Sequence, residues 1–218
     1  MKKMTRAGHG RINRQHAAFV SGWAGYNCFF PFFSTNTTFV PATTLLSAGQ
    51  WNILEKKEWH TLLAWSLGAH LCLKNLHRIR ARRLILMAPF LDFCAYTPRQ
   101  RVLKMKAGLE KNPRALVRWF WRMSSTGPGD DRLIEETGLL RAGLDFLLES
   151  RVDLKGVHCR IPIILIHGVH DRIVPARASE KILEYLPHAC YFPVPWGHYI
   201  PEDEIMKIGY EEKDKDQL

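Results

Sequence analysis

The sequence predicts an α/β protein with a mostly parallel sheet of about six strands, helices on both faces and a helical insertion. Three observations support this prediction. Short apolar runs alternate with helical segments over residues 17–88. Strand-like runs resume at residues 163–167 and 190–194. Between these parts, residues 93–150 contain only helical patterns broken by proline and glycine. We therefore expect one domain over residues 1–218, a length that allows a sizeable core.

Each element of the predicted sheet has its own local signal. Apolar and β-branched runs predict buried strands at residues 17–21, 37–41, 61–65, 83–88, 163–167 and 190–194. Amphipathic patterns predict helices at residues 45–59 and 67–80. We expect the basic start, residues 1–16, to fray and the charged end, residues 211–218, to be disordered. The alternation of strands and helices indicates a sheet covered on both faces.

A serine stands at the junction of one predicted strand and the next helix. Ser66 is flanked two residues away by Ala64 and Gly68 in the stretch LLAWSLGA. This pattern resembles the G-x-S-x-G elbow of the α/β-hydrolases, in which a nucleophilic serine occupies a strained, tight turn. Small flanking residues are needed there because the turn lies close to its neighbours. We interpret Ser66 as a nucleophile, with a helix N-cap as the alternative.

The partners of a nucleophilic serine follow downstream in the order that this fold uses. A serine hydroxyl needs a base that is itself oriented by a carboxylate, and the chain order is serine, acid, histidine. Asp171 lies in the loop GVHDRIVP after one strand, and His198 lies in PWGHYIP after the next. Asp92, which follows the strand at residues 83–88, is the alternative acid. We favour the triad Ser66, Asp171 and His198.

The reaction also needs two N–H donors for the developing negative charge. The backbone N–H of Leu67 follows the nucleophile directly. The backbone N–H of Trp23, in the loop SGWAG after the first strand, is the candidate for the second donor. The alternative for Trp23 is a plain core aromatic.

Several segments resemble the biotin-pathway carboxylesterases that demethylate pimeloyl-acyl-carrier-protein methyl ester. They are SGWAG, LLAWSLGAH, LRAGLDFLLESRVDLKGVHCRIPIILIHGVHDRIVP and PWGHYIP. That family carries a Gly-Trp-Gly loop, a Gly-Trp-Ser-Leu-Gly elbow and a Gly-x-x-Asp-x-x-Val-Pro loop. The resemblance covers most of residues 17–201 and implies a serine carboxylesterase that needs no metal or cofactor. By position, it implies the roles already given to Ser66, Asp171, His198, Trp23 and Leu67.

The chain also departs from the family pattern. Ala64 replaces the first glycine of the elbow, and Ser21 stands where hydrolases often carry histidine. Fewer residues than usual separate Trp23 from Ser66, and only 16 residues precede the first core strand. We therefore expect a trimmed core, as in the shorter members of these esterases.

The helical insertion is unusually basic. Eight basic residues lie between Arg99 and Arg122, against one acidic residue, Glu110. Arg114, Arg118 and Arg122 are spaced by four and fall on one face of a helix, with apolar residues on the other. We call this row of arginines the basic ridge, and it could bind an acidic acyl carrier protein. The alternative is an ordinary solvated helix face. The net charge of +10 also favours an acidic partner, but no nucleic-acid-binding module is recognisable.

The composition argues against several other classes of protein. Five cysteines occur without a C-x-x-C pair, which argues against a zinc site or a disulfide framework and favours a reducing compartment. No apolar run reaches the ~18 residues of a membrane span. The apolar stretch at residues 17–33 is interrupted by glycine, asparagine and proline, unlike a signal peptide. We expect a cytoplasmic monomer without stable membrane insertion.

These observations favour a serine carboxylesterase that acts on the methyl ester of pimeloyl-acyl-carrier-protein. One alternative is a generalist short-chain esterase or thioesterase with the same triad. Another, of a different class, is a catalytically silent protein of the same fold that binds an acidic partner.

Overall fold

The computed structural model describes residues 16–47 and 49–211. Six strands form one sheet in the order β2-β1-β3-β4-β5-β6, and every neighbouring pair is parallel. The strands are β1 (Ala17–Val20), β2 (Thr38–Val40), β3 (Thr61–Trp65), β4 (Leu84–Met87), β5 (Ile163–Gly168) and β6 (Cys190–Val194). Each lies within one residue of its predicted bounds, so the six-stranded sheet is confirmed. The predicted frayed start and disordered end fall almost wholly outside the described residues.

The strand sequences match their positions in the sheet. Strands β1, β3, β4 and β5 are buried along their whole length, as expected for parallel strands covered on both faces. On one face Phe19 packs against the rings of Phe30, Phe33 and Phe39, with centroids 4.6–5.5 Å apart. Strand β6 lies at the edge of the sheet and is partly exposed, which explains why it tolerates Pro193.

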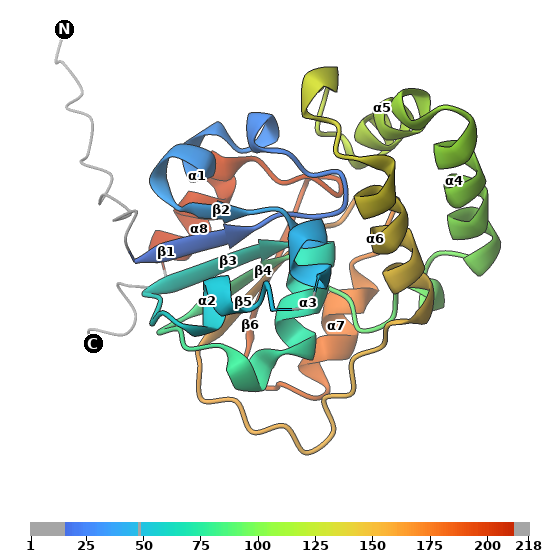
Figure 1. Ribbon diagram of the computed structural model, residues 1–218. Coiled ribbons are helices and arrows are strands. Elements are labelled where there is room, and N and C mark those ends of the chain that lie inside the picture. The colour runs from blue at the N-terminus through green and yellow to red at the C-terminus, as the bar shows by residue number, and fades with distance from the viewer. Residues whose placement is uncertain (1–15, 48, 212–218) are drawn as a thin grey trace, which may run out of the picture.

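Helices cover both faces of the sheet (Figure 1). On one face lie α1 (Pro31–Asn36) and α8 (Glu202–Glu211), and on the other lie α3 (Leu67–Lys74) and α7 (Arg177–Leu183). The Glu202 carboxylate joins the first two, because it accepts hydrogen bonds from the backbone N–H groups of Phe32 and Phe33 at 3.0 and 2.7 Å. Within the described chain, none of the helices is both long and apolar enough to cross a bilayer.

Two helix predictions need correction. Most of the helix expected at residues 45–59 is absent; a 3₁₀ turn (Ala42–Leu46) and the short helix α2 (Asn52–Glu55) take its place. Gly49 has a φ of +79°, which breaks a helical path between them. The helix expected at residues 67–80 ends at Lys74, where the Asn75 side chain bonds the carbonyl of Leu71. A 3₁₀ turn (Leu76–Arg78) follows.

The helical insertion lies over the carboxyl ends of the strands (Figure 1). Its helices are α4 (Arg99–Lys111), α5 (Pro113–Ser124) and α6 (Thr137–Glu149). Two tryptophans anchor it to the loop after β1. Trp121 of α5 donates to the carbonyl of Ala24 at 3.0 Å, and Trp23 of the loop donates to the carbonyl of Leu140 in α6 at 2.8 Å.

The strand order also marks where a ligand would bind. From β1 the chain passes to β2 on one side, and it then returns to β3 on the other side of β1. In open α/β sheets, ligands bind beyond the carboxyl ends of the strands at such a reversal. The loop after β1 and the turn after β3 meet there, under the helical insertion.

A buried histidine next to this point predicts a pH-dependent stability. His70 of α3 lies 3.0 Å from the Phe90 carbonyl through Nδ1 and 2.8 Å from the Ser150 hydroxyl through Nε2. A carbonyl only accepts, so Nδ1 carries the proton and Nε2 accepts from Ser150. Burial lowers the pKa of His70 to about 4. The imidazole in the folded protein is therefore neutral well below its ordinary range.

We expect the free energy of unfolding to fall as the pH drops from about 6.5 towards 4. Over that range the unfolded chain takes up a proton on His70 that the folded protein does not bind, which costs up to about 3 kcal/mol. Denaturant titrations of wild type and His70→Gln at several pH values test this. If the glutamine variant keeps the full wild-type pH dependence, His70 is not its source.

Candidate active site

Ser66 occupies the strained turn that the sequence predicts. It follows β3 directly and precedes α3, with φ 54° and ψ −116°. A Cβ at Gly68 would lie 2.5 Å from the carbonyl oxygens of both Val20 and Ser21, so only glycine fits this approach of α3 to β1. Ala64 is fully buried in β3, where its methyl group is accommodated. The elbow therefore forms with alanine, in place of glycine, two residues before Ser66.

The structure brings Ser66, His198 and Asp171 into one hydrogen-bonded chain. The Ser66 Oγ lies 2.8 Å from His198 Nε2, and His198 Nδ1 lies 2.7 Å from Asp171 Oδ2. All three side chains are buried. The carboxylate can only accept, so Nδ1 carries the imidazole proton and Nε2 is free to accept the proton of Ser66. This is the arrangement that an activated serine requires.

The loops after β5 and β6 bring the acid and the base together. Gly168, the last residue of β5, makes this possible, because a Cβ there would lie 2.1 Å from the Gly197 carbonyl oxygen. The backbone N–H groups of Val169 and His170 donate to the carbonyls of Val194, at the end of β6, and Trp196, in the loop after it, at 2.9 and 3.0 Å.

Asp171 is held as a carboxylate. Its Oδ1 accepts from the backbone N–H groups of Ile173 and Val174 at 2.7 and 2.9 Å. Burial alone would raise the pKa of Asp171, but His198 and His167 outweigh burial and hold it well below its ordinary range. His167 Nε2 lies 3.3 Å from Asp171 Oδ2, a supporting role that was not predicted from the sequence.

Asp92, the alternative acid, has other contacts. Its Oδ1 accepts from the backbone N–H of Cys94 at 2.9 Å, and its Oδ2 pairs with Arg151 Nε at 3.0 Å. The carboxylate that contacts His198 is that of Asp171. The geometry therefore favours Asp171 over Asp92 as the acid that orients His198.

The backbone beside Ser66 can supply the two donors of an oxyanion hole. The loop after β1 runs directly past the serine, since a Cβ at Gly22 would lie 3.1 Å from Ser66 Cβ. Within the described residues, neither the Trp23 nor the Leu67 backbone N–H has a hydrogen-bond acceptor. Both groups are thus free to bind the oxygen of a substrate. The Trp23 side chain is buried, so the core-aromatic interpretation also holds for its ring.

Trp65 is a site residue that the sequence reasoning missed. Its indole Nε1 donates to the His198 carbonyl at 2.8 Å. A Cβ at Gly22 or Gly25 would lie 2.9 or 2.7 Å from its ring, so the loop after β1 packs closely on the same indole. Trp65 therefore holds His198 in place relative to Ser66 and the loop after β1. Its position directly before Ser66 was the available signal.

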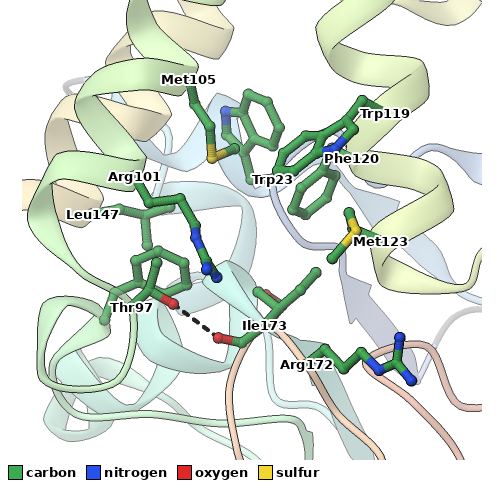
Figure 2. A pocket seen from close by; sticks show the side chains of 12 residues that line it. Trp23, Thr97, Arg101, Met105, Trp119, Phe120, Met123, Leu147, Arg172 and Ile173 are labelled. Carbon is green, nitrogen blue, oxygen red and sulfur yellow. Dashed lines mark hydrogen bonds between the residues drawn. The ribbon is translucent and has the colours of Figure 1, made fainter.

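A mostly apolar cavity lies over Ser66, and we call it the acyl cavity (Figure 2). It is lined by Trp23, Ser66, Phe93, Thr97, Arg101, Met105, Trp119, Phe120, Met123, Leu147, Arg172 and Ile173. Its free volume is about 30 Å³, which is room for one or two water molecules. An acyl chain can enter only if lining side chains move, and Met105 and Met123 are flexible enough to do so.

The three arginines of the predicted ridge differ in their contacts. Arg118 forms a two-pronged ion pair with Asp131, and this hydrogen-bonded contact lowers the pKa of that aspartate. Within the described chain, Arg114 and Arg122 have no ion-pair partner. Arg99 and Lys106, two other basic residues of the insertion, pair with Glu149 and Asp145. These acidic partners are distant in sequence and could not be assigned from the helix alone.

No protein-family model and no curated protein matches this sequence. Solved structures do match it. An esterase from Exiguobacterium antarcticum shares 15% identity, with 94% of this chain and 93% of that chain covered and a TM-score of 0.71. A thermophilic esterase from Thermogutta terrifontis shares 14% identity over 93% and 90%, with a TM-score of 0.65. The chain has the α/β-hydrolase fold.

A type II thioesterase from the yersiniabactin NRPS/PKS biosynthetic pathway is also similar, at 16% identity over 91% of each chain and a TM-score of 0.58. At such identities, the likenesses establish the hydrolase fold. The roles of individual side chains therefore depend on the geometry of this site. The described residues contain no group of three potential metal ligands.

Proposed function

We propose that the protein is a serine hydrolase of carboxylic esters. The observation that carries this proposal is the hydrogen-bonded chain Ser66–His198–Asp171 at a strained elbow. The esterases and the thioesterase that share the fold support it. Each residue of the chain has a chemical role in such a reaction.

The reaction would proceed in two halves. Ser66 Oγ attacks the ester carbonyl while His198 Nε2 takes its proton, and the oxyanion binds the Leu67 and Trp23 N–H groups. The C–O bond to the alcohol breaks as His198 returns the proton to the leaving oxygen, which gives an acyl-enzyme. Water, deprotonated by His198, then attacks the acyl carbon, and Ser66 leaves with the returned proton.

For the substrate we propose the methyl ester of an acyl chain carried by an acidic acyl carrier protein, with pimeloyl as the first candidate. The support is the family resemblance, the apolar acyl cavity over Ser66 and the unpaired cations of the insertion. Generalist short-chain esters or thioesters are the alternative. The cytoplasmic location and the monomeric state stay predictions.

Turnover separates this proposal from a silent binding protein. We expect hydrolysis of a chromogenic short-chain ester by the purified protein. Among candidate substrates, we expect the highest kcat/KM for the pimeloyl-carrier methyl ester, above the same methyl ester without the carrier. Equal values would favour the generalist alternative, and no turnover of any ester by well-folded protein would exclude the enzyme.

Arg114 gives a sharper test of carrier docking. Arg114→Glu should raise KM for the carrier-linked ester roughly fivefold and leave kcat unchanged, because a lost exposed contact and a new repulsion act on binding. The effect should shrink at high salt. Arg114→Gln and Arg118→Gln form the matched pair, because both remove one positive charge: the Arg118 guanidinium is already paired with Asp131, so we expect Arg118→Gln to raise KM less. Equal effects on carrier-linked and carrier-free esters would remove the support for docking.

A further inference from the structure

A second, polar cleft opens beside the acyl cavity. It has a volume of about 340 Å³ and is lined by Arg122, Met123, Ser125, His170, Arg172 and Gly197. Met123 and Arg172 line both spaces, so the two are neighbours with a common wall. A ligand that fills the acyl cavity can therefore extend into this polar cleft.

The walls of the polar cleft belong to the segments that build the catalytic triad. Arg122 lies in the last turn of α5, His170 and Arg172 flank Asp171, and Gly197 precedes His198. Backbone hydrogen bonds connect these segments: Tyr199 N–H donates to Ser124 at 2.9 Å, and His170 N–H donates to Trp196 at 3.0 Å. The cleft thus has a fixed frame and a fixed relation to the nucleophile.

The polar cleft is lined by positively charged side chains. Two guanidinium groups and one imidazole line it, and no acidic side chain does. Across the described chain, the side chains of Arg122, His170 and Arg172 have no hydrogen-bond or ion-pair partner. Asp171, between two of them in sequence, is buried and turned towards His198. Among the described residues, no carboxylate therefore pairs with either guanidinium group.

The donor groups that line the polar cleft indicate what kind of anion it could bind. Figure 2 shows the Arg101 side chain reaching from α4 towards the centre of the acyl cavity, whereas the Arg172 guanidinium is turned away from it. Arg122, Arg172, His170 and the Ser125 hydroxyl all line the polar cleft and can donate hydrogen bonds to an anion there. Guanidinium groups bind carboxylate and phosphate oxygens alike, and a phosphate monoester offers these donors three free oxygens, one more than a carboxylate.

We propose that the polar cleft binds a phosphate group carried by the substrate whose acyl chain fills the neighbouring cavity. The proposal rests on the proposed esterase function for its biological meaning. The binding itself is independent of turnover and can be measured without it. The phosphate would be part of the arm that carries the acyl group, as in a 4′-phosphopantetheine thioester.

The test compares two ligands that differ by one phosphate. S-hexanoyl-4′-phosphopantetheine and S-hexanoyl-pantetheine are titrated by calorimetry into full-length Ser66→Ala protein, which cannot form the acyl-enzyme. We expect the phosphate to increase affinity roughly tenfold or more, since it gains charge-assisted hydrogen bonds. Arg122→Gln and Arg172→Gln, each combined with Ser66→Ala, should remove most of this gain. Arg172→Lys should keep part of it.

Arg114→Gln in the same background is the matched control, because Arg114 is an exposed arginine of the same helix outside the polar cleft. It should keep the full phosphate gain. Equal affinity of the two ligands would overturn the proposal. A gain that survives both cleft variants, or that Arg114→Gln removes equally, would also overturn it in favour of general attraction to a basic surface.

These outcomes are separable from those of the proposed function. A protein without esterase activity could still show the phosphate gain in this titration. An active esterase without the phosphate site would hydrolyse the chromogenic ester and bind both pantetheine ligands equally.

Discussion

Ser66→Ala should lower kcat for any ester roughly 10⁴-fold or more and leave the protein folded. The Ser66 Oγ is the group assigned to form the acyl-enzyme, and it lies 2.8 Å from His198 Nε2, which would take its proton. The residual rate would come from binding and from the Leu67 and Trp23 N–H groups. Among the described residues, the Ser66 hydroxyl is hydrogen-bonded to His198 alone, so the melting temperature should change little.

A covalent probe tests the same assignment without a substrate. A serine-reactive phosphonate should label wild-type protein once per chain and should not label Ser66→Ala. Mass spectrometry of the labelled peptide locates the modified residue. Circular dichroism and thermal unfolding of the variant serve as the control for folding. Labelling that persists in Ser66→Ala, or a variant that retains wild-type kcat, would show that another residue is the nucleophile.

The sheet was predictable because its strands are short runs that turns separate from the helices, and four of the six are buried along their whole length. Residues 61–65 and 190–194 were placed without error, since apolar runs before a Gly- or Ser-containing turn have few other interpretations. The helix at residues 45–59 was not predictable in the same way. Trp51, Leu54 and Trp59 are buried as an amphipathic pattern requires. Short turns around Gly49 bury the same side chains without a continuous helix.

The triad was predictable because its members follow strands whose carboxyl ends meet at one edge of the sheet. Their order and spacing carried enough information to place Ser66, Asp171 and His198 together. Residues that act through long-range contacts gave no such signal. The ion pair of Arg118 with Asp131 depends on how the chain between two helices turns. The support of His198 by Trp65 depends on where the loop after β6 crosses the elbow.

Asp171→Asn should be nearly as damaging as the loss of the nucleophile, and the structure gives the reason. The Ile173 and Val174 N–H groups both point at Oδ1. An asparagine would keep its oxygen at that position to accept them, so its NH₂ group would face His198 Nδ1. Nδ1 would then have to accept, and the imidazole proton would move to Nε2, where it blocks transfer from Ser66. We expect kcat to fall roughly 10⁴-fold.

Asp92→Asn is the matched control for Asp171→Asn, because it makes the same chemical change on the alternative acid. Its oxygen can still accept from the Cys94 N–H, and it loses only the partly exposed pair with Arg151. Such a pair contributes at most about 1 kcal/mol to stability, so kcat should stay near wild type. Steady-state kinetics and thermal unfolding of both variants decide the matter. If Asp92→Asn proves to be the crippling change while Asp171→Asn retains most of its activity, the hydrogen bond to His198 does not mark the catalytic acid.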